Sequence, residues 1–154
     1  MKRLLLIFLT AIAAFTATAA NPAIRDIDIT YILTPEGHAR VTEVWDVTVV
    51  SGTEWYLVKY DMGSHVSITD FAVTDENDVD FINEGDWDLD RNIKQKAGKC
   101  GIYRKGGDDY ELCWGVGSYG DHTYTVKYTI HNFILSMNDY DALHFQFISP
   151  GLSS

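Results

Sequence analysis

The stretch His122–Ile130, HTYTVKYTI, decides the fold class of this chain. Its apolar and polar residues alternate, and successive side chains of a β-strand leave opposite faces of a sheet. One parity carries Tyr124, Val126, Tyr128 and Ile130, and the other carries Thr123, Thr125, Lys127, Thr129 and His131. A strand with one apolar and one polar face is typical of an antiparallel sheet that covers a core on one side. We therefore expect a half-buried antiparallel strand here.

The same period of two recurs along most of the chain. Residues 27–33 and 41–49 alternate on either side of TPEGH at 34–38, and this arrangement predicts an antiparallel hairpin. Glu43 is an exception, because it places a carboxylate on the apolar side of its strand. Further strands are expected at 55–60, at 66–73 and along the apolar alternation of Leu143, Phe145 and Phe147.

Residues 83–98 show no clear period, and we expect a loop there with a short helical turn near 93–97. The chain as a whole then holds about seven to eight short strands, frequent turns and almost no helix. Such a pattern predicts an all-β fold, an antiparallel β-sandwich that is immunoglobulin-like in general architecture.

The first twenty residues have the three parts of a secretory signal peptide. Lys2 and Arg3 precede an apolar run over 4–15, and small residues with an A-x-A pattern follow at 17–19. The apolar run is shorter than the ~20 residues of an ordinary membrane span. We therefore expect residues 1–20 to be a signal peptide and residues 21–154 to be one domain exported across the cytoplasmic membrane, to the periplasm or the cell surface.

The charge of the chain limits its partners. The formal net charge is −10, and loss of the signal peptide removes two basic residues and leaves −12. An acidic surface repels nucleic-acid backbones and anionic headgroups, so we expect neither as a partner. It is compatible with a protein or a carbohydrate ligand in the cell envelope.

The two cysteines bracket a glycine pair in KCGIYRKGGDDYELCW, residues 99–114. A two-residue turn at Gly106-Gly107 would fix the register of a hairpin. The facing pairs would be Cys100 with Cys113, Arg104 with Asp109, and Tyr103 with Tyr110. Facing cysteines in an exported chain predict a structural disulfide. Two buried free thiols are the alternative, whereas the spacing suits neither a redox C-x-x-C pair nor a zinc site.

Two groups of carboxylates are candidates for chemistry. Asp86, Asp88 and Asp90 in DWDLDR resemble the opening of a calcium loop, but the glycine and glutamate that an EF-hand needs later in the loop are missing. Glu43 could serve as a catalytic acid of a carbohydrate-active enzyme, although the sequence nominates no second carboxylate for it. The five histidines show no metal-binding spacing, and we expect no metal centre and no cofactor.

Aromatic residues could form a ligand platform on the sandwich. The candidates are Trp55, Tyr56, Trp87 and Tyr119, with Tyr60 and Trp114 as further members. Most large aromatic side chains in a small domain belong to the core, so the alternative for each of them is a packing role.

Several stretches resemble a known family. They are DIDITYILTPEGHARVTEVWDV at 26–47, KAGKCGIYR at 96–104, YELCWGVG at 110–117 and GVGSYGDHTYTVKYTI at 115–130. Together they are similar to domain-of-unknown-function family 2207, the predicted bacterial membrane proteins. The resemblance implies an exported N-terminal β-sandwich followed by transmembrane helices, and it carries over no catalytic residue because the function of the family is unknown.

These observations favour a non-catalytic binding or interaction module over an enzyme. We expect this module to be tethered to the membrane through segments absent from the chain, since the apolar strand near the end runs into SPGLSS with nothing to cover it. The alternative is a cell-envelope enzyme acting on carbohydrate through Glu43 or an acid of residues 86–90.

Overall fold

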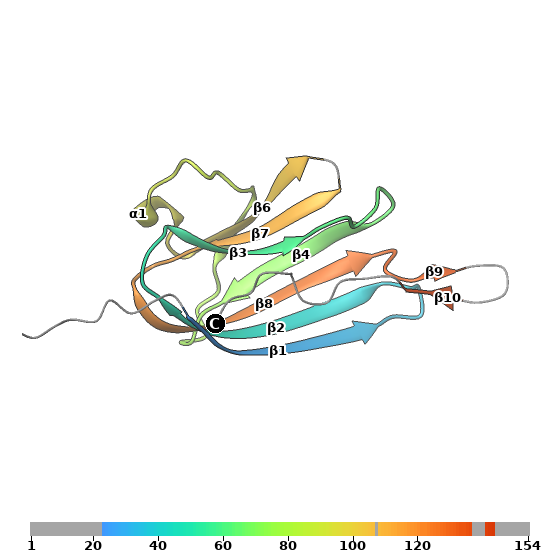
Figure 1. Cartoon of the computed structure of the whole chain (residues 1–154), viewed down its shortest axis with the longest axis horizontal. Helices are drawn as coiled ribbons and strands as arrows, with labels where there is room; N and C mark the ends of the chain where they lie inside the picture. Colours follow the sequence, from blue (N-terminus) through green and yellow to red (C-terminus); the bar gives the residue numbers. More distant parts are fainter. Residues whose placement is uncertain (1–22, 107, 137–140, 144–154) are drawn as a thin grey trace, which may run out of the picture.

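A computed structural model describes residues 23–106, 108–136 and 141–143 as two stacked β-sheets (Figure 1). Each sheet has four strands, in the orders β1-β2-β8-β4 and β3-β7-β6-β5. The predicted all-β sandwich is thus confirmed, with eight strands in its two layers. The expected signal peptide and Phe145 and Phe147 lie outside the described residues.

The first sheet contains the strands that the alternation predicted best. It is built from β1 (Ala23–Leu33), β2 (Ala39–Val49), β8 (Gly120–His131) and β4 (Ser67–Thr74), all antiparallel. Every second residue of β2 is buried, because its alternate side chains face the second sheet. The hairpin of β1 and β2 turns at residues 34–38, as expected. A separate two-stranded sheet of β9 (Leu135–Ser136) and β10 (Asp141–Ala142) follows β8.

The second sheet departs from an all-antiparallel sandwich at one edge. It is built from β3 (Glu54–Lys59), β7 (Asp109–Gly115), β6 (Lys99–Gly106) and β5 (Ile82–Asp86). Strand β5 pairs parallel to β6, in a segment where we predicted a loop. All five of its residues are exposed. The strand therefore has no alternation of buried and exposed residues that a sequence pattern could reveal.

The predicted helical turn is confirmed as α1 (Ile93–Lys96). Asn92 caps it, because its side chain accepts hydrogen bonds from the backbone N–H groups of Lys94 and Gln95, while the Gln95 side chain accepts from the N–H of Asn92. This reciprocal capping defines the start of a helix that is only one turn long.

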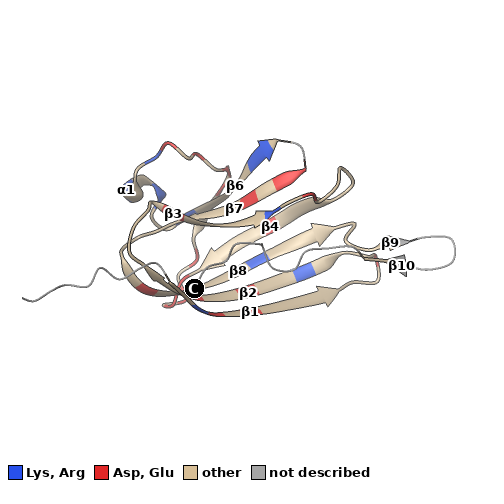
Figure 2. Ribbon diagram, in the orientation of Figure 1, with Lys and Arg blue, Asp and Glu red and all other residues tan. Residues whose placement is uncertain are grey.

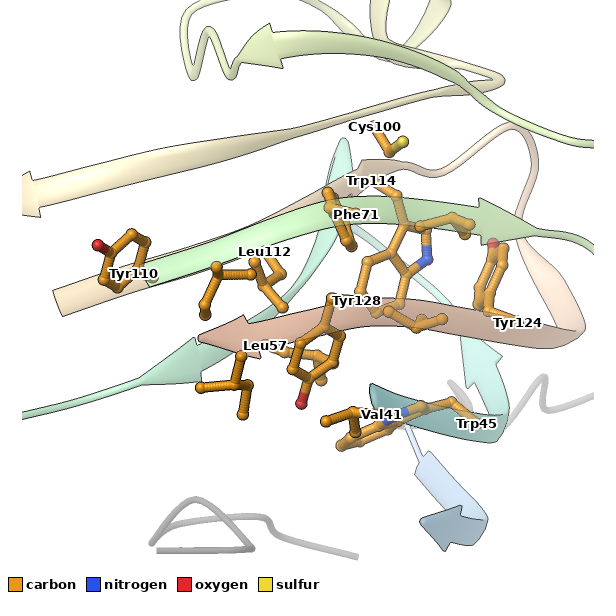
Figure 3. Packing of buried hydrophobic residues seen from close by; sticks show 14 of the residues in the cluster. Val41, Trp45, Leu57, Phe71, Cys100, Tyr110, Leu112, Trp114, Tyr124 and Tyr128 are labelled. Carbon is orange, nitrogen blue, oxygen red and sulfur yellow. The ribbon is translucent and has the colours of Figure 1, made fainter. Parts of the chain in front are cut away.

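The hydrophobic core lies between the inner faces of the two sheets (Figure 3). Trp114 of β7 is fully buried there, and its ring packs edge-on against that of Tyr124 of β8, with 5.5 Å between the centroids. Edge-to-face aromatic pairs of this kind add to the stabilisation that burial alone provides. The apolar parity of His122–Ile130 therefore faces the core, as the opening pattern predicted.

The predicted register of the β6–β7 hairpin is wrong by one residue. Gly106, with φ of 109°, pairs with Asp109 and still belongs to β6, so the turn does not begin at Gly106 as predicted. An irregularity between Arg104 and Gly106 then shifts the pairing again. The observed partners are Cys100 with Trp114, Gly101 with Cys113, Ile102 with Leu112, Tyr103 with Glu111, and Arg104 with Tyr110.

This register also overturns the predicted disulfide between Cys100 and Cys113. Because Cys113 faces Gly101 and Cys100 faces Trp114, the two cysteines point to opposite faces of the sheet. Both are free and fully buried. Burial raises the pKa of the Cys100 thiol to about 11 and that of the Cys113 thiol to about 12. The alternative of two buried free thiols is the one that the structure contains.

The outer face of the second sheet is partly covered by the segment that links β5 to β6. Helix α1 packs against Gly115, where a Cβ atom would lie 1.9 Å from the backbone oxygen of Lys96. Trp87 packs against Gly101, where a Cβ atom would lie 3.3 Å from its ring. The two glycines therefore give the linking segment its close approach to β6 and β7, and Cys113 is buried beneath it on this face.

Candidate functional site

Glu43 lies inside the sandwich and is 1% exposed. Its Oε1 accepts hydrogen bonds from Lys59 Nζ at 2.9 Å and from the Tyr128 hydroxyl at 2.5 Å, and its Oε2 accepts one from Trp45 Nε1 at 2.9 Å. Lys59 comes from β3, whereas the other three residues come from β2 and β8. The carboxylate therefore ties the first sheet to the second through an ion pair.

The aromatic partners of Glu43 are held in their neutral form. Burial, followed by the negative charge of Glu43, raises the pKa of Tyr128 far above its ordinary value. The same two causes raise the pKa of Tyr31 to about 12. Lys59 Nζ lies 5.3 Å from the centre of the Tyr128 ring, where a cation is attracted to the ring face. The cluster is thus one buried charge pair with neutral donors around it.

This geometry removes the basis for Glu43 as a catalytic acid. Three donors already occupy its two oxygens, and the side chain is enclosed between the sheets. A general acid must come within hydrogen-bond distance of its substrate. Glu43 acts as a structural carboxylate, which explains why a charged residue sits on the apolar parity of β2.

A second buried lysine fastens the segment between β5 and β6. Lys96 Nζ contacts Glu54 Oε2 at 2.9 Å, Thr53 Oγ1 at 3.1 Å and the Leu89 carbonyl oxygen at 2.7 Å. It also lies 5.8 Å from the centre of the Trp87 ring, whose Nε1 donates to Glu54. All three N–H donors of the ammonium group are therefore satisfied, and Trp87 is a buried part of this network.

The acidic residues of DWDLDR are exposed, and the partners of Asp88 are local. Asp88 Oδ1 accepts from the backbone N–H of Asp90 at 3.0 Å, and its Oδ2 contacts Arg91 at 3.2 Å. Arg91 also pairs with Glu84. Among the residues that the structure describes, no three His, Cys, Asp or Glu side chains meet in a way that could hold a metal ion.

The predicted aromatic platform is divided between different parts of the molecule. Trp87 and Trp114 are buried, and Trp55 packs partly against the core. Tyr119 is exposed, but its hydroxyl donates a hydrogen bond to the carbonyl oxygen of Gly52, which comes just before β3. Two of the proposed aromatic residues are exposed near each other in the sequence. Tyr56 lies in β3 and is 53% exposed, and Tyr60 follows the end of β3 and is 43% exposed.

These two tyrosines belong to a surface that the sequence did not indicate. The observed register places Tyr103 of β6 beside Glu111 of β7, and Glu111 beside Val58, on the outer face of the second sheet. Glu111 is only 12% exposed and contacts Lys105 Nζ at 3.4 Å. We call Tyr56, Tyr60, Tyr103, Lys105 and Glu111 the tyrosine face. In Figure 2 the end of β6 carries basic residues and the adjacent part of β7 carries acidic ones.

The electrostatics of the tyrosine face are centred on its ion pair. The hydrogen bond from Lys105 to Glu111 is the main cause that raises the pKa of the lysine, and Tyr60 and Tyr56 contribute further. The sequence could not indicate Glu111 or Tyr103, because the predicted register paired Tyr103 with Tyr110, which the structure places in the core.

We predict that Lys59→Met destabilises the fold strongly, because it leaves the carboxylate of Glu43 buried without its cation. The free energy of unfolding from denaturant titration should fall by about 3–5 kcal/mol. Combining the change with Glu43→Gln should restore much of the loss, since the buried charge is then gone. The control is Arg25→Met, which breaks exposed pairs with Asp46 and Asp121 and should change stability little. Equal small effects of Lys59→Met and Arg25→Met would contradict the cross-sheet tie.

The chain is similar to a known protein family. The model of the N-terminal domain of predicted membrane proteins (DUF2207) matches residues 23–153. Neither a search of curated proteins nor a search of solved structures gives a match. Within the described part of the chain, no helix has the length and apolarity that a bilayer crossing requires. The match spans every strand of the sandwich, and the chain therefore belongs to the DUF2207 family of predicted membrane proteins and contains the N-terminal domain of that family.

Proposed function

We propose that this domain is a non-catalytic binding module of a membrane protein and that it lies on the extracytoplasmic side of the membrane. The tyrosine face carries the proposal of binding. It combines two exposed aromatic side chains with a nearly buried carboxylate and its lysine. Exposed tyrosines are enriched at recognition surfaces, because each one offers a large rigid ring with a polar end.

The enclosure of Glu43 and of both thiols supports binding over catalysis by these groups. The carboxylate of Glu43 is enclosed and fully engaged, and the thiols of Cys100 and Cys113 are buried in their protonated form. Nucleophilic chemistry by cysteine requires an accessible thiolate. No observation on the described residues therefore favours the alternative of a carbohydrate-active envelope enzyme.

The proposed location draws on the sequence at the start of the chain. Basic residues, an apolar run and an A-x-A pattern precede the domain, as in exported proteins. The family consists of predicted membrane proteins, so a domain carried on one side of a bilayer is consistent with it.

The location can be tested with a single introduced thiol. Val79, between β4 and β5, is exposed, whereas both native cysteines are buried with raised pKa values and should not react with a maleimide in the folded chain. We expect a membrane-impermeant maleimide to label the Val79→Cys protein on intact cells. The unsubstituted protein is the matched control and should stay unlabelled. Labelling of Val79→Cys only after the cells are permeabilised would contradict the extracytoplasmic location.

Binding at the tyrosine face can be tested by photo-crosslinking in the full-length membrane protein. A benzophenone amino acid at Tyr56 should give adducts with a component of the envelope, because this side chain is exposed on the proposed surface. The control position is Thr42, which lies on the outer face of the opposite sheet. Adducts that form at Thr42 as readily as at Tyr56, or at neither position, would contradict a binding role for this face.

A further inference from the structure

We infer that the ligand of the tyrosine face is a neutral oligosaccharide, an inference that rests on the proposed binding function. The chain carries a net charge of −10, yet the charged groups of this face neutralise each other. Lys105 pairs with Glu111, and the neighbouring carboxylates of Glu54 and Asp109 are held by Lys96 and by the backbone N–H of Asp61. The backbone N–H that holds Asp109 is neutral and leaves its negative charge in place, whereas the lysine of this face is already paired. An anionic ligand would therefore meet no unpaired lysine here.

The ion pair offers both kinds of hydrogen-bonding group that a sugar requires. The Glu111 carboxylate accepts hydrogen bonds, and the Lys105 ammonium group donates them. Their separation of 3.4 Å is long for a charged hydrogen bond, and Lys105 is 56% exposed. Neighbouring hydroxyl groups of a pyranose ring can donate to the Glu111 carboxylate and accept from the Lys105 ammonium group. The two charges of the pair then remain compensated.

The exposed rings supply the apolar half of the site. A pyranose has an apolar C–H face, which packs favourably on the electron-rich face of an aromatic ring. Tyr56 lies in β3 and Tyr60 comes one residue after its end, four positions on, a length that spans about 13 Å in an extended chain. This span is longer than one sugar ring, and the half-buried Val58 lies between them. The arrangement suits an oligosaccharide lying along β3, with one sugar near each tyrosine.

The inference can be tested by calorimetric titration of the full chain with defined glycans. We expect saturable binding of a neutral hexasaccharide, tried as cello- and chito-oligosaccharides, and weaker binding of an anionic oligogalacturonate. Tyr56→Ala and Tyr60→Ala should each weaken binding by about tenfold, the size expected for a central aromatic contact. Tyr56→Phe should retain most of the affinity, because the ring face is kept.

The matched control is Tyr119→Ala, since Tyr119 is as exposed as Tyr56 but lies off the tyrosine face. It should leave glycan binding unchanged. Absence of binding to every neutral oligosaccharide, stronger binding of the anionic one, or an equal loss in Tyr119→Ala would overturn the inference. If glycans fail while the crosslinker at Tyr56 captures a protein, the ligand class is wrong and the proposed binding function stands.

Discussion

The register of β6 against β7 is the constraint on which the second sheet depends. A shift of one residue turns every side chain of a strand to the other face. In the observed register Leu112 and Trp114 enter the core, while Glu111 and Cys113 face outward. Gly101 and Gly115 then lie on the outer face as well. Because they have no side chain, they leave the space on this face in which Trp87 and α1 pack. The covered and the exposed parts of this face both follow from one pairing.

Two buried charge pairs also fix parts of the fold, and one of them joins the two sheets. The cross-sheet pair of Lys59 with Glu43 lies in the core, and the pair of Lys96 with Glu54 lies under the segment that covers the second sheet. A buried charge is costly unless it is paired and hydrogen-bonded, so such pairs contribute little stability over apolar residues but strongly penalise any arrangement that separates them. We interpret them as determinants of how the layers and the linking segment are placed.

The sequence predicted the first sheet well, because its strands bury one face and therefore alternate. It also identified Glu43 as an unusual residue, although only the structure shows that Lys59 and Tyr128 satisfy it. Strand β5 could not be predicted, since an exposed parallel edge strand has no alternation. The hairpin register was wrong because Gly106 is part of the strand, and the sequence of a glycine pair does not specify which of its residues begins the turn.

The same error concealed most of the tyrosine face. Tyr56 was identified from its residue type, but Glu111 and Tyr103 become its neighbours only in the observed register. The most direct test of this account is therefore a nuclear Overhauser measurement of the β6–β7 pairing in the full chain. We expect a cross-strand Hα–Hα contact between Ile102 and Leu112. A contact between Cys100 and Cys113 in its place would contradict the register, the free thiols and the tyrosine face together.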